Sequence, residues 1–369
     1  MKAFKILISF LLWVLIACGV ATFYFWNWLN TSQNIHSEQQ VYLVEKGSNI
    51  YREAEKLHEL GVLRWPKVWV YFARYQKMDN IKAGEYRLQD SETPVSLLNT
   101  LIEGKTIQYS VTLVEGQSFK EFLSILHSDD RLEKTLAENS KASEPAELYL
   151  EGFLGKKIDV QHFEGWFFPD TYQFSRGDTD YSILQRAYNK MRLVLDEEWE
   201  TRSKNLPYKT PYEALIMASI IEKETGVPHE REDISGVFVR RLNKGMKLQT
   251  DPTIIYGMGD AYKGNITRRN LREATPYNTY VIKGLPPTPI AMPGREAIHA
   301  ALHPKKGESL FFVAKGDGTH QFSATLNDHN NAVNKYQKVR VKNYRSSPVK
   351  KSKLPTKETV KDSQEVSEK

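Results

Sequence analysis

The N-terminus constrains this chain more than any other stretch of it. After Lys2 and Lys5, the run from Ile6 to Trp28 is almost wholly apolar. It is about 23 residues long, which at ~1.5 Å per residue is enough to cross a hydrocarbon core of about 30 Å. Lysines precede the run and aromatic residues crowd its far end, so the positive-inside rule keeps residues 1–5 in the cytoplasm. We therefore predict a single-pass anchor at 6–28 in the inner (cytoplasmic) membrane, with the rest of the chain on the periplasmic or extracytoplasmic side.

Two other export signals compete with an uncleaved anchor. One is a cleaved signal peptide, and the other is a lipoprotein signal, since Leu15-Ile-Ala-Cys18 resembles a lipobox. Either signal predicts an apolar core that ends near the cleavage point. Here the apolar run continues about ten residues past Cys18 and no small-residue cleavage site follows, which favours the anchor. Cys18 is also the only cysteine, so the exported body has no intrachain disulfide, cysteine zinc ligand or thiol nucleophile.

The charge of the chain does not point to nucleic acid. The formal net charge is +6, but many of the basic residues lie in the tail at 342–369. The tail has almost no apolar residues and is expected to be disordered. A second polar stretch, 29–40, is interpreted as a linker between the anchor and the body. The 40% hydrophobic content of 369 residues allows two modest domains with real cores.

A strand, a turn and a capped helix recur three times after residue 40. In the first copy, Val41–Val44 is the strand, Ser48 caps a helix over 50–60, and Gly61 ends it. Units of this kind are typical of small α+β binding domains, although repetition alone can be purely structural. The other copies are Gly84–Leu88 with Thr93-Pro94 and a helix over 95–102, and Val111–Val114 with Ser118 and a helix over 119–126.

A helix after residue 210 carries two glutamates near its end. Its start is marked by Thr210-Pro-Tyr-Glu213, a capping box with proline at the first helical position. At about 100° per residue, Glu222 lies in line with Leu215 on the apolar side, whereas Glu224 lies on the opposite, polar side. Glu224 is therefore expected to be solvated.

The position of Glu222 calls for a chemical reason. A carboxylate on an apolar face is costly unless it is paired or protonated, and a carboxyl with a raised pKa is what a general acid near neutral pH needs. Glu222 is thus a candidate general acid. The alternative is a buried ion pair with Arg240 or Arg241, and helix geometry alone does not separate the two.

Three downstream segments, 248–257, 275–280 and 284–294, are rich in hydroxyls, amides and aromatic rings between prolines and glycines. Such chemistry suits a rigid carbohydrate groove, though ordinary surface loops share it. The sequence has no glycine-rich phosphate loop, His/Asp metal spacing or Gly-x-Ser-x-Gly elbow, so neither a metal nor a cofactor is expected. Gly316-Asp-Gly318 is interpreted as a tight turn before a strand, since the calcium-loop pattern is incomplete.

Several sequence motifs, and the order in which they occur, resemble those of the YceG-like family. These are the membrane-anchored endolytic murein transglycosylases called MltG. The resemblance extends from the anchor to about residue 336. It rests on Glu164-Gly-Trp-Phe-Phe-Pro-Asp-Thr171, Ala218-Ser-Ile-Ile-Glu-Lys-Glu-Thr225, Leu248-Gln-Thr-Asp-Pro-Thr253, Tyr277-Asn-Thr-Tyr280, Gly284-Leu-Pro-Pro287 and His329-Asn330.

The resemblance implies an α+β fold with an N-terminal transmembrane helix, a small LysM-like glycan-binding module at 41–110 and a larger mixed α+β catalytic domain at 111–341. By the family's pattern, the first glutamate of Glu-Lys-Glu-Thr, here Glu222, is catalytic, and no metal or cofactor is required. Candidate glycan contacts in the downstream segments are Gln249, Thr250, Asp251, Tyr256, Asn278 and Tyr280.

The implied substrate is the peptidoglycan glycan strand. The implied reaction cuts the bond between N-acetylmuramic acid and N-acetylglucosamine, leaves a 1,6-anhydro end and terminates strand growth at the membrane, with peptidoglycan polymerases as partners. Two alternatives stay open. A lysozyme-like muramidase would need Asp251 or Asp170 as a second carboxylate, and a non-catalytic scaffold would only bind peptidoglycan. The aminodeoxychorismate lyase label given to some family members conflicts with an exported chain that lacks a recognisable cofactor lysine.

Overall fold

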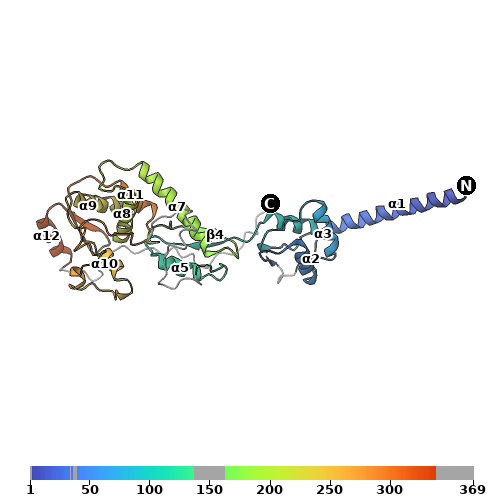
Figure 1. Ribbon diagram of the computed structural model, residues 1–369, viewed down its shortest axis with the longest axis horizontal. Helices are drawn as coiled ribbons and strands as arrows, with labels where there is room; N and C mark the ends of the chain where they lie inside the picture. Colours follow the sequence, from blue (N-terminus) through green and yellow to red (C-terminus); the bar gives the residue numbers. More distant parts are fainter. Residues whose placement is uncertain (1, 34, 36–39, 137–162, 338–369) are drawn as a thin grey trace, which may run out of the picture. The chain divides into compact units, whose positions relative to one another are not determined.

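The computed structural model describes residues 2–33, 35, 40–136 and 163–337. The predicted tail at 342–369 lies outside the described residues. The chain divides into two compact units (Figure 1). The first unit contains 1–113, 120–145 and 170–186, and the second contains 114–119, 146–169 and 187–369.

The N-terminal helix α1, Lys2–Leu29, is a candidate membrane anchor. Its stretch Phe4–Leu29 is long and apolar enough to cross a membrane, by length and composition. The end of the helix differs from its body, because Trp28 is only 7% exposed and Leu29 is fully buried. Both side chains lie in the hydrophobic core of the module that follows, and so does Ile35. Leu29 and Ile35, which were expected in a linker, are therefore part of a packed core.

The module itself is built on a short antiparallel ribbon. Strand β1 (Val41–Val44) pairs with β2 (Gly84–Arg87), and alternate residues of β1 face the core. Three helices share that core: α2 (Ile50–Glu59), α3 (Pro66–Tyr75) and α4 (Pro94–Glu103). The alternation of the strands and the spacing of apolar residues in the helices therefore account for these elements.

One helix cap of the module differs from the prediction. Asn49, not Ser48, caps α2, since its side-chain oxygen accepts hydrogen bonds from two backbone N–H groups of the first turn, at 3.0 and 3.1 Å. The Ser48 hydroxyl donates to the buried carboxylate of Glu53 instead. Thr93 caps α4 as predicted, in a reciprocal capping box with Ser96.

The predicted order of strand and helix is found in all three copies, and their strands pair in two separate ribbons. The third strand, β3 (Tyr109–Thr112), is followed by α5 (Phe119–His127), as the repeat requires. However, β3 pairs antiparallel with the distant β4 (Thr171–Phe174), while β1 pairs with β2. The three copies thus contribute to two separate ribbons, because strand partners are chosen by long-range packing rather than by the local pattern.

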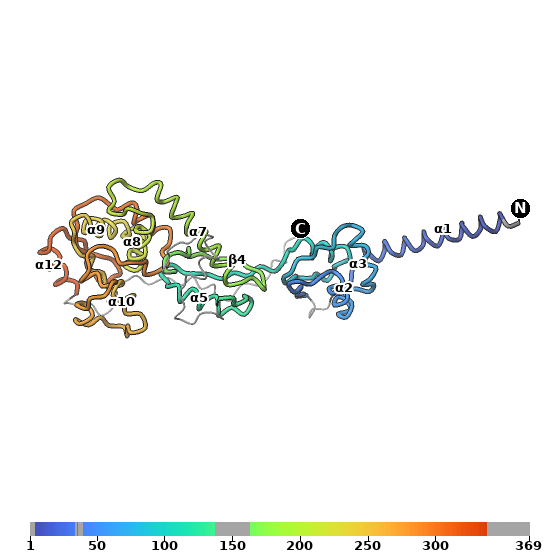
Figure 2. Tube along the Cα trace, in the orientation of Figure 1, coloured from blue at the N-terminus to red at the C-terminus, as the bar shows by residue number. Residues whose placement is uncertain are grey.

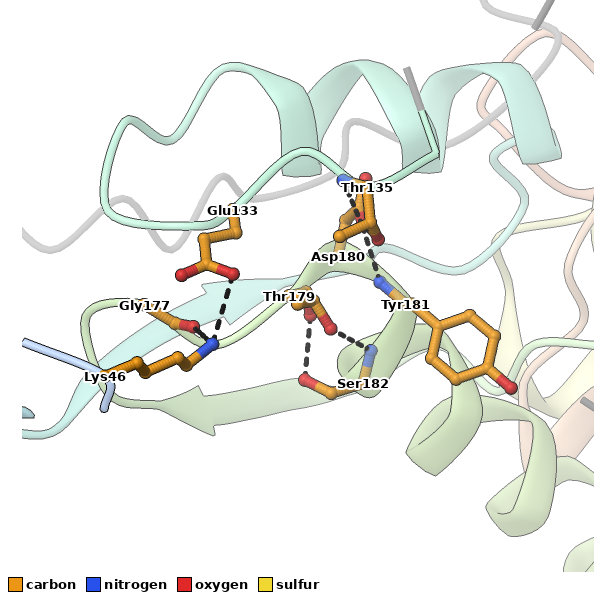
Figure 3. A network of polar contacts seen from close by, with 8 residues as sticks. All are labelled: Lys46, Glu133, Thr135, Gly177, Thr179, Asp180, Tyr181 and Ser182. Atoms are coloured by element: carbon orange, nitrogen blue, oxygen red, sulfur yellow. Dashed lines mark hydrogen bonds and ion pairs between the residues drawn. The ribbon is translucent and has the colours of Figure 1, made fainter. Parts of the chain in front are cut away.

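A buried carboxylate ties the start of α7 (Asp180–Glu200) to the segment after α5 (Figure 3). Asp180 accepts hydrogen bonds from the backbone N–H groups of Thr135 at 3.0 Å and Leu136 at 3.1 Å, and from the Thr135 hydroxyl. Burial alone would raise the pKa of Asp180, but these hydrogen bonds outweigh it and lower the pKa. Figure 3 also shows Lys46 reaching the Glu133 carboxylate, at 3.1 Å, and the Gly177 carbonyl.

The second unit is mainly helical and centres on α8, Pro211–Glu224. Every side chain from Ala214 to Ile221 is buried, and α8 packs against α9 and α11 (Figure 1). Thr210 caps α8 by accepting from the Glu213 N–H at 3.2 Å, while the Glu213 carboxylate accepts from the N–H of Lys209. The other elements are η2 (Pro228–Glu230), α9 (Arg231–Asn243), α10 (Asp251–Met258), η3 (Gly259–Ala261), η4 (Asn270–Arg272), α11 (Arg295–Leu302), the hairpin β5 (Phe311–Ala314) and β6 (His320–Ser323), and α12 (Leu326–Tyr336).

The hairpin confirms the predicted turn. Strands β5 and β6 pair antiparallel, and the N–H of Lys315 donates to the Thr319 carbonyl at 2.8 Å across the turn. Asp317 accepts from the backbone and the hydroxyl of Thr319, which closes the loop locally.

Candidate active site

The C-terminal end of α8 presents its two glutamates to different surroundings. The helix ends at Glu224, and Thr225 is its extended C-cap. Beside this end lies a cavity of about 720 Å³, a size typical of ligand sites. Its wall includes Glu224, Gln249, Asp251 and Tyr280.

Glu224 has the more unusual chemistry of the pair. The hydroxyl of Thr250 donates a hydrogen bond to its Oε1. Burial, with a smaller contribution from the nearby negative charge of Asp251, raises the pKa of Glu224 to about 7, although the Thr250 hydrogen bond acts in the opposite direction. The prediction that Glu224 is a solvated residue on the polar face is therefore wrong. The helical wheel could not include the loop before α10, which covers this side of α8.

Thr250 is held in place by a set of buried hydroxyls. It is only 2% exposed, and its N–H donates to the Thr279 hydroxyl at 3.1 Å. The Thr253 and Thr279 hydroxyls lie 2.9 Å apart. The preceding residue, Gln249, has a left-handed backbone with φ of 54°, and its N–H donates to the Thr279 carbonyl at 3.1 Å. Such a conformation in a non-glycine residue stores strain, and the surrounding hydrogen bonds hold it.

Asp251 and Tyr280 form the next part of the wall. The Tyr280 hydroxyl donates to Asp251 Oδ1 at 2.7 Å. Burial, the charge of Asp251 and this hydrogen bond together raise the pKa of Tyr280, so Tyr280 stays a neutral donor. Asp251 is also the first residue of α10, a position where the helix dipole favours a carboxylate.

Three of the six predicted glycan contacts, Thr250, Asn278 and Tyr256, are not among the residues that line the cavity. Thr250 binds Glu224, as described above. Asn278 is 1% exposed; its amide nitrogen donates to the carbonyls of Asn270 and Glu273 at 2.9 and 2.7 Å, so it supports the loop and offers no surface to a ligand. The Tyr256 hydroxyl donates to Glu164 Oε2 at 3.2 Å. Gln249, Asp251 and Tyr280 are the predicted contacts that line the cavity.

Glu222 lies at a different site, beside the start of α11. Its half-buried carboxylate accepts from the N–H of Gly294 at 3.2 Å, and Gly294 is the N-cap of α11. A carboxylate is favoured there because the first turn of a helix leaves N–H groups unpaired and carries a partial positive charge. The guanidinium groups of Arg240 and Arg241, the alternative partners from the sequence, hydrogen-bond to backbone carbonyls, at 2.8 Å to Ser309 and 2.7 Å to Leu310 for their Nε atoms.

Comparison with known proteins adds the family. The profile of the YceG-like family matches residues 42–335. The chain belongs to the YceG-like family. Bacillus subtilis (strain 168) has a protein named endolytic murein transglycosylase that is 30% identical over 305 residues, covering 79% of this chain and 83% of that protein. A Streptococcus pneumoniae (serotype 2, strain D39) protein of the same name is 27% identical over 361 residues, covering 90% of this chain and 65% of its own length.

A solved structure supports the family assignment. The crystal structure of a yceG-like protein from Listeria monocytogenes aligns with 79% of this chain and 98% of its own, with a TM-score of 0.51 and 28% identity. The fold of this chain is thus YceG-like, with mixed helices and strands and one apolar N-terminal helix.

Sequence reasoning missed the role of Glu164 in this YceG-like unit. Glu164 is 6% exposed; its Oε1 accepts from the Phe119 N–H at 3.0 Å and its Oε2 from Tyr256. It therefore joins two segments far apart in the chain. The only signal in the sequence was its place at the head of the aromatic run 164–171, which carried part of the family resemblance.

Within the described residues, one group has the ligand atoms to hold a metal. Glu198, His299 and His303 bring one such atom each to within 4.8 Å of one another. Glu198 accepts from Arg295 at 3.1 Å and contacts His299 at 2.8 Å, so its carboxylate is already paired. Burial, together with the neighbouring His299, lowers the pKa of His303. The cavity beside Glu224 has other lining residues, and we assign no metal to the site.

Proposed function

We propose that this chain is an endolytic lytic transglycosylase. It cleaves the N-acetylmuramic acid to N-acetylglucosamine bond of nascent peptidoglycan strands and leaves 1,6-anhydro-muramic acid ends. Both named relatives are endolytic murein transglycosylases. The observation that carries the proposal is the cavity that holds Glu224, a carboxyl whose pKa of about 7 keeps a large fraction protonated near neutral pH.

The reaction needs one group that first gives and then takes a proton. Protonated Glu224 donates its proton to the glycosidic oxygen as that bond breaks and positive charge develops on the sugar. The resulting carboxylate then takes the proton of the muramoyl 6-hydroxyl, whose oxygen attacks the anomeric carbon and closes the anhydro ring. Water is not consumed, and Glu224 ends the cycle protonated.

The neighbours of Glu224 suit both steps. The negative charge of Asp251 disfavours ionised Glu224, so it holds the proton before cleavage and draws the second proton back afterwards. The same charge can stabilise the cationic transition state. Tyr280 fixes Asp251 through its hydroxyl, and Gln249 lines the same wall for contact with the glycan.

The cavity and the raised pKa of Glu224 support it as the acid, whereas the family resemblance points to Glu222, which stays the alternative acid. In the arrangement that we propose, Glu222 positions α11 through the N–H of its N-cap. The two residues are a natural matched pair for mutagenesis, since Glu to Gln removes the titrating group at either position with little change in shape.

Mass spectrometry of digestion products tests both assignments. The full-length chain in detergent, Glu222→Gln and Glu224→Gln are each incubated with purified peptidoglycan. We expect 1,6-anhydro ends from the first two proteins and none from Glu224→Gln. The reverse pattern would make Glu222 the acid. Reducing ends would indicate a muramidase with Asp251 as its second carboxylate, and a folded wild-type protein that makes no product would favour the scaffold.

The cellular setting is part of the proposal. Helix α1 would anchor the enzyme in the inner membrane with its N-terminus in the cytoplasm, and the β1-α2-α3-β2-α4 module would serve as a LysM-like glycan-binding unit. Cleavage beside the membrane would terminate strands where peptidoglycan polymerases make them. Protease digestion tests the orientation. The second unit should be protected from added protease in intact cells, and it should be cleaved once the outer face of the inner membrane is exposed.

A further inference from the structure

The outer face of α3 is apolar where a soluble domain is normally polar. Trp65, at the N-cap, and Val68 are each 39% exposed, Tyr71 is 71% exposed and Tyr75 is 84% exposed. Positions 68, 71 and 75 are three and four residues apart, so their side chains form one stripe along the helix. The buried side of the same helix carries Trp69, Val70 and Ala73. A helix that is apolar on both sides is expected to be covered on both sides.

The stripe is continuous with the end of the candidate anchor. The Trp65 ring lies 5.0 Å from the ring of Trp28, and the Phe72 ring lies 6.1 Å from that of Phe25. Figures 1 and 2 both show the end of α1 beside α3. Trp65 and Phe72 border the exposed stripe on the helical wheel of α3, so the apolar surface of α1 passes directly into that of α3.

The length of the anchor places this junction at the membrane surface. The apolar stretch of 26 residues is about 39 Å long, whereas the hydrocarbon core is about 30 Å thick. The last turns of α1, with Phe25 and Trp28, therefore reach the headgroup region, and α3 lies at their depth. Trp and Tyr side chains prefer this region because their rings are apolar and their N–H and O–H groups remain hydrated.

The charges around the stripe fit a lipid surface as well. Helix α3, Pro66–Tyr75, contains Lys67 and Arg74 and no acidic residue. Arg64 lies just before it, with its guanidinium 5.4 Å from the Trp65 ring. When aromatic rings enter the headgroup region, basic side chains beside them are attracted to the phosphate groups of lipids.

We propose that α3 lies in the headgroup region of the outer leaflet as a second membrane contact beside the anchor. The small module is then docked on lipid through Trp65, Val68, Tyr71 and Tyr75, and its orientation to the bilayer is fixed. The inference rests on the proposed anchoring by α1, because it takes the depth of α3 from the end of that helix.

Site-specific quenching in lipid vesicles tests the contact. In a full-length Cys18→Ser background, Tyr71→Cys or Tyr75→Cys carries an environment-sensitive fluorophore, and the vesicles contain lipids with a quencher near the headgroup. Glu55→Cys, at an exposed position of α2, is the matched surface control. Val14→Cys, measured with a quencher placed deep in the bilayer, reports insertion of α1. We expect quenching at 71 and 75 at least about threefold above that at 55.

Each other outcome overturns the inference in a different way. Quenching at 14 but no excess at 71 and 75 leaves the anchor standing and removes the α3 contact. Absence of quenching at 14 removes the anchor and the contact together. If labels at 71 and 75 are not quenched by lipid but become shielded when glycan strands are added, this face binds glycan rather than lipid.

A double variant tests which side chains make the contact. In a Val68→Ser, Trp65→Ser background, the quenching at 75 should fall toward the control value.

Discussion

The small module and the surroundings of the cavity differ in the sequence separation of the residues whose contacts define them. In the module, a helix cap is three residues from the group it caps, as in Thr93 and Ser96. At the cavity, Thr250 meets Glu224 from 26 residues away and is itself held by Thr279, 29 residues further on. Local patterns therefore identify the elements of the module, whereas the chemistry of Glu224 depends on which loop folds over the end of α8.

The largest expected effect is at the cavity. Glu224→Gln should lower the rate of glycan cleavage by about 10²–10⁴-fold, because it removes the group that we propose exchanges both protons. Glu222→Gln should retain activity within about tenfold, since a positioning hydrogen bond is worth roughly 1 kcal/mol. Initial rates of anhydro-product formation measure both. Equal losses in the two variants would erase the distinction between the two glutamates.

In the module, the largest expected effect is on the free energy of unfolding. Trp69 is fully buried and its Nε1 donates to the Pro94 carbonyl at 2.7 Å, so Trp69→Ala should destabilise the module by about 3–5 kcal/mol. Hydrogen exchange of α2, α3 and α4 measures this loss. Because the two units have separate cores, exchange in α8 should change little; a parallel loss there would show that the regions do not fold independently.

Stability should depend on pH through Glu224. Its folded-state pKa of about 7 lies above the ordinary value of 4.5, so the folded state holds its proton longer and loses stability as pH rises from about 4.5 to 7. Glu224→Gln should therefore stabilise the second unit by about 1–3 kcal/mol above pH 7, after allowance for partial solvent exposure, and by little at pH 4. Denaturant unfolding at both pH values checks the sign. Equal effects at pH 4 and 8 would contradict a raised pKa.

The alkaline limit of activity should move in opposite directions in two variants. With Glu224 as the proposed acid, activity should fall above pH 7 as Glu224 loses its proton. Thr250→Val removes a hydrogen bond that favours the carboxylate, so the limit moves to higher pH; Asp251→Asn removes a repelling charge, so it moves lower. Profiles of kcat/KM against pH measure the shift. Shifts of the same sign would mean that another group sets the limit.

The smallest expected change in stability distinguishes the roles of two neighbouring residues of the module, Asn49 and Ser48. Asn49→Ala should destabilise α2 by about 1 kcal/mol, because Asn49 caps the helix. Ser48→Ala removes a hydrogen bond to buried Glu53 and leaves the cap intact. Hydrogen exchange at Tyr51 and Arg52, whose N–H groups bind Asn49, should accelerate only in the first variant.

Several features of the fold could be predicted because their causes are local. The apolar run gave α1, capping residues gave the start of α8, and Gly316–Gly318 gave the hairpin turn. The pairing of β3 with β4 and the half-buried surroundings of Glu224 could not be predicted, because both depend on segments distant in sequence. The motif 218–225 directed attention to the end of α8, but a helical wheel could not tell which of its two glutamates would line the cavity.

Leu29 belongs both to the apolar helix and to the core of the module, and this has a consequence for how the protein matures. The module reaches its full stability only when the helix that precedes it is present and helical to its last turn. With α1 as the proposed anchor, membrane insertion and folding would be thermodynamically linked, and a protease that cuts after Leu29 would release a module that lacks two of its core side chains, Trp28 and Leu29. Shedding from the membrane would therefore also weaken the fold.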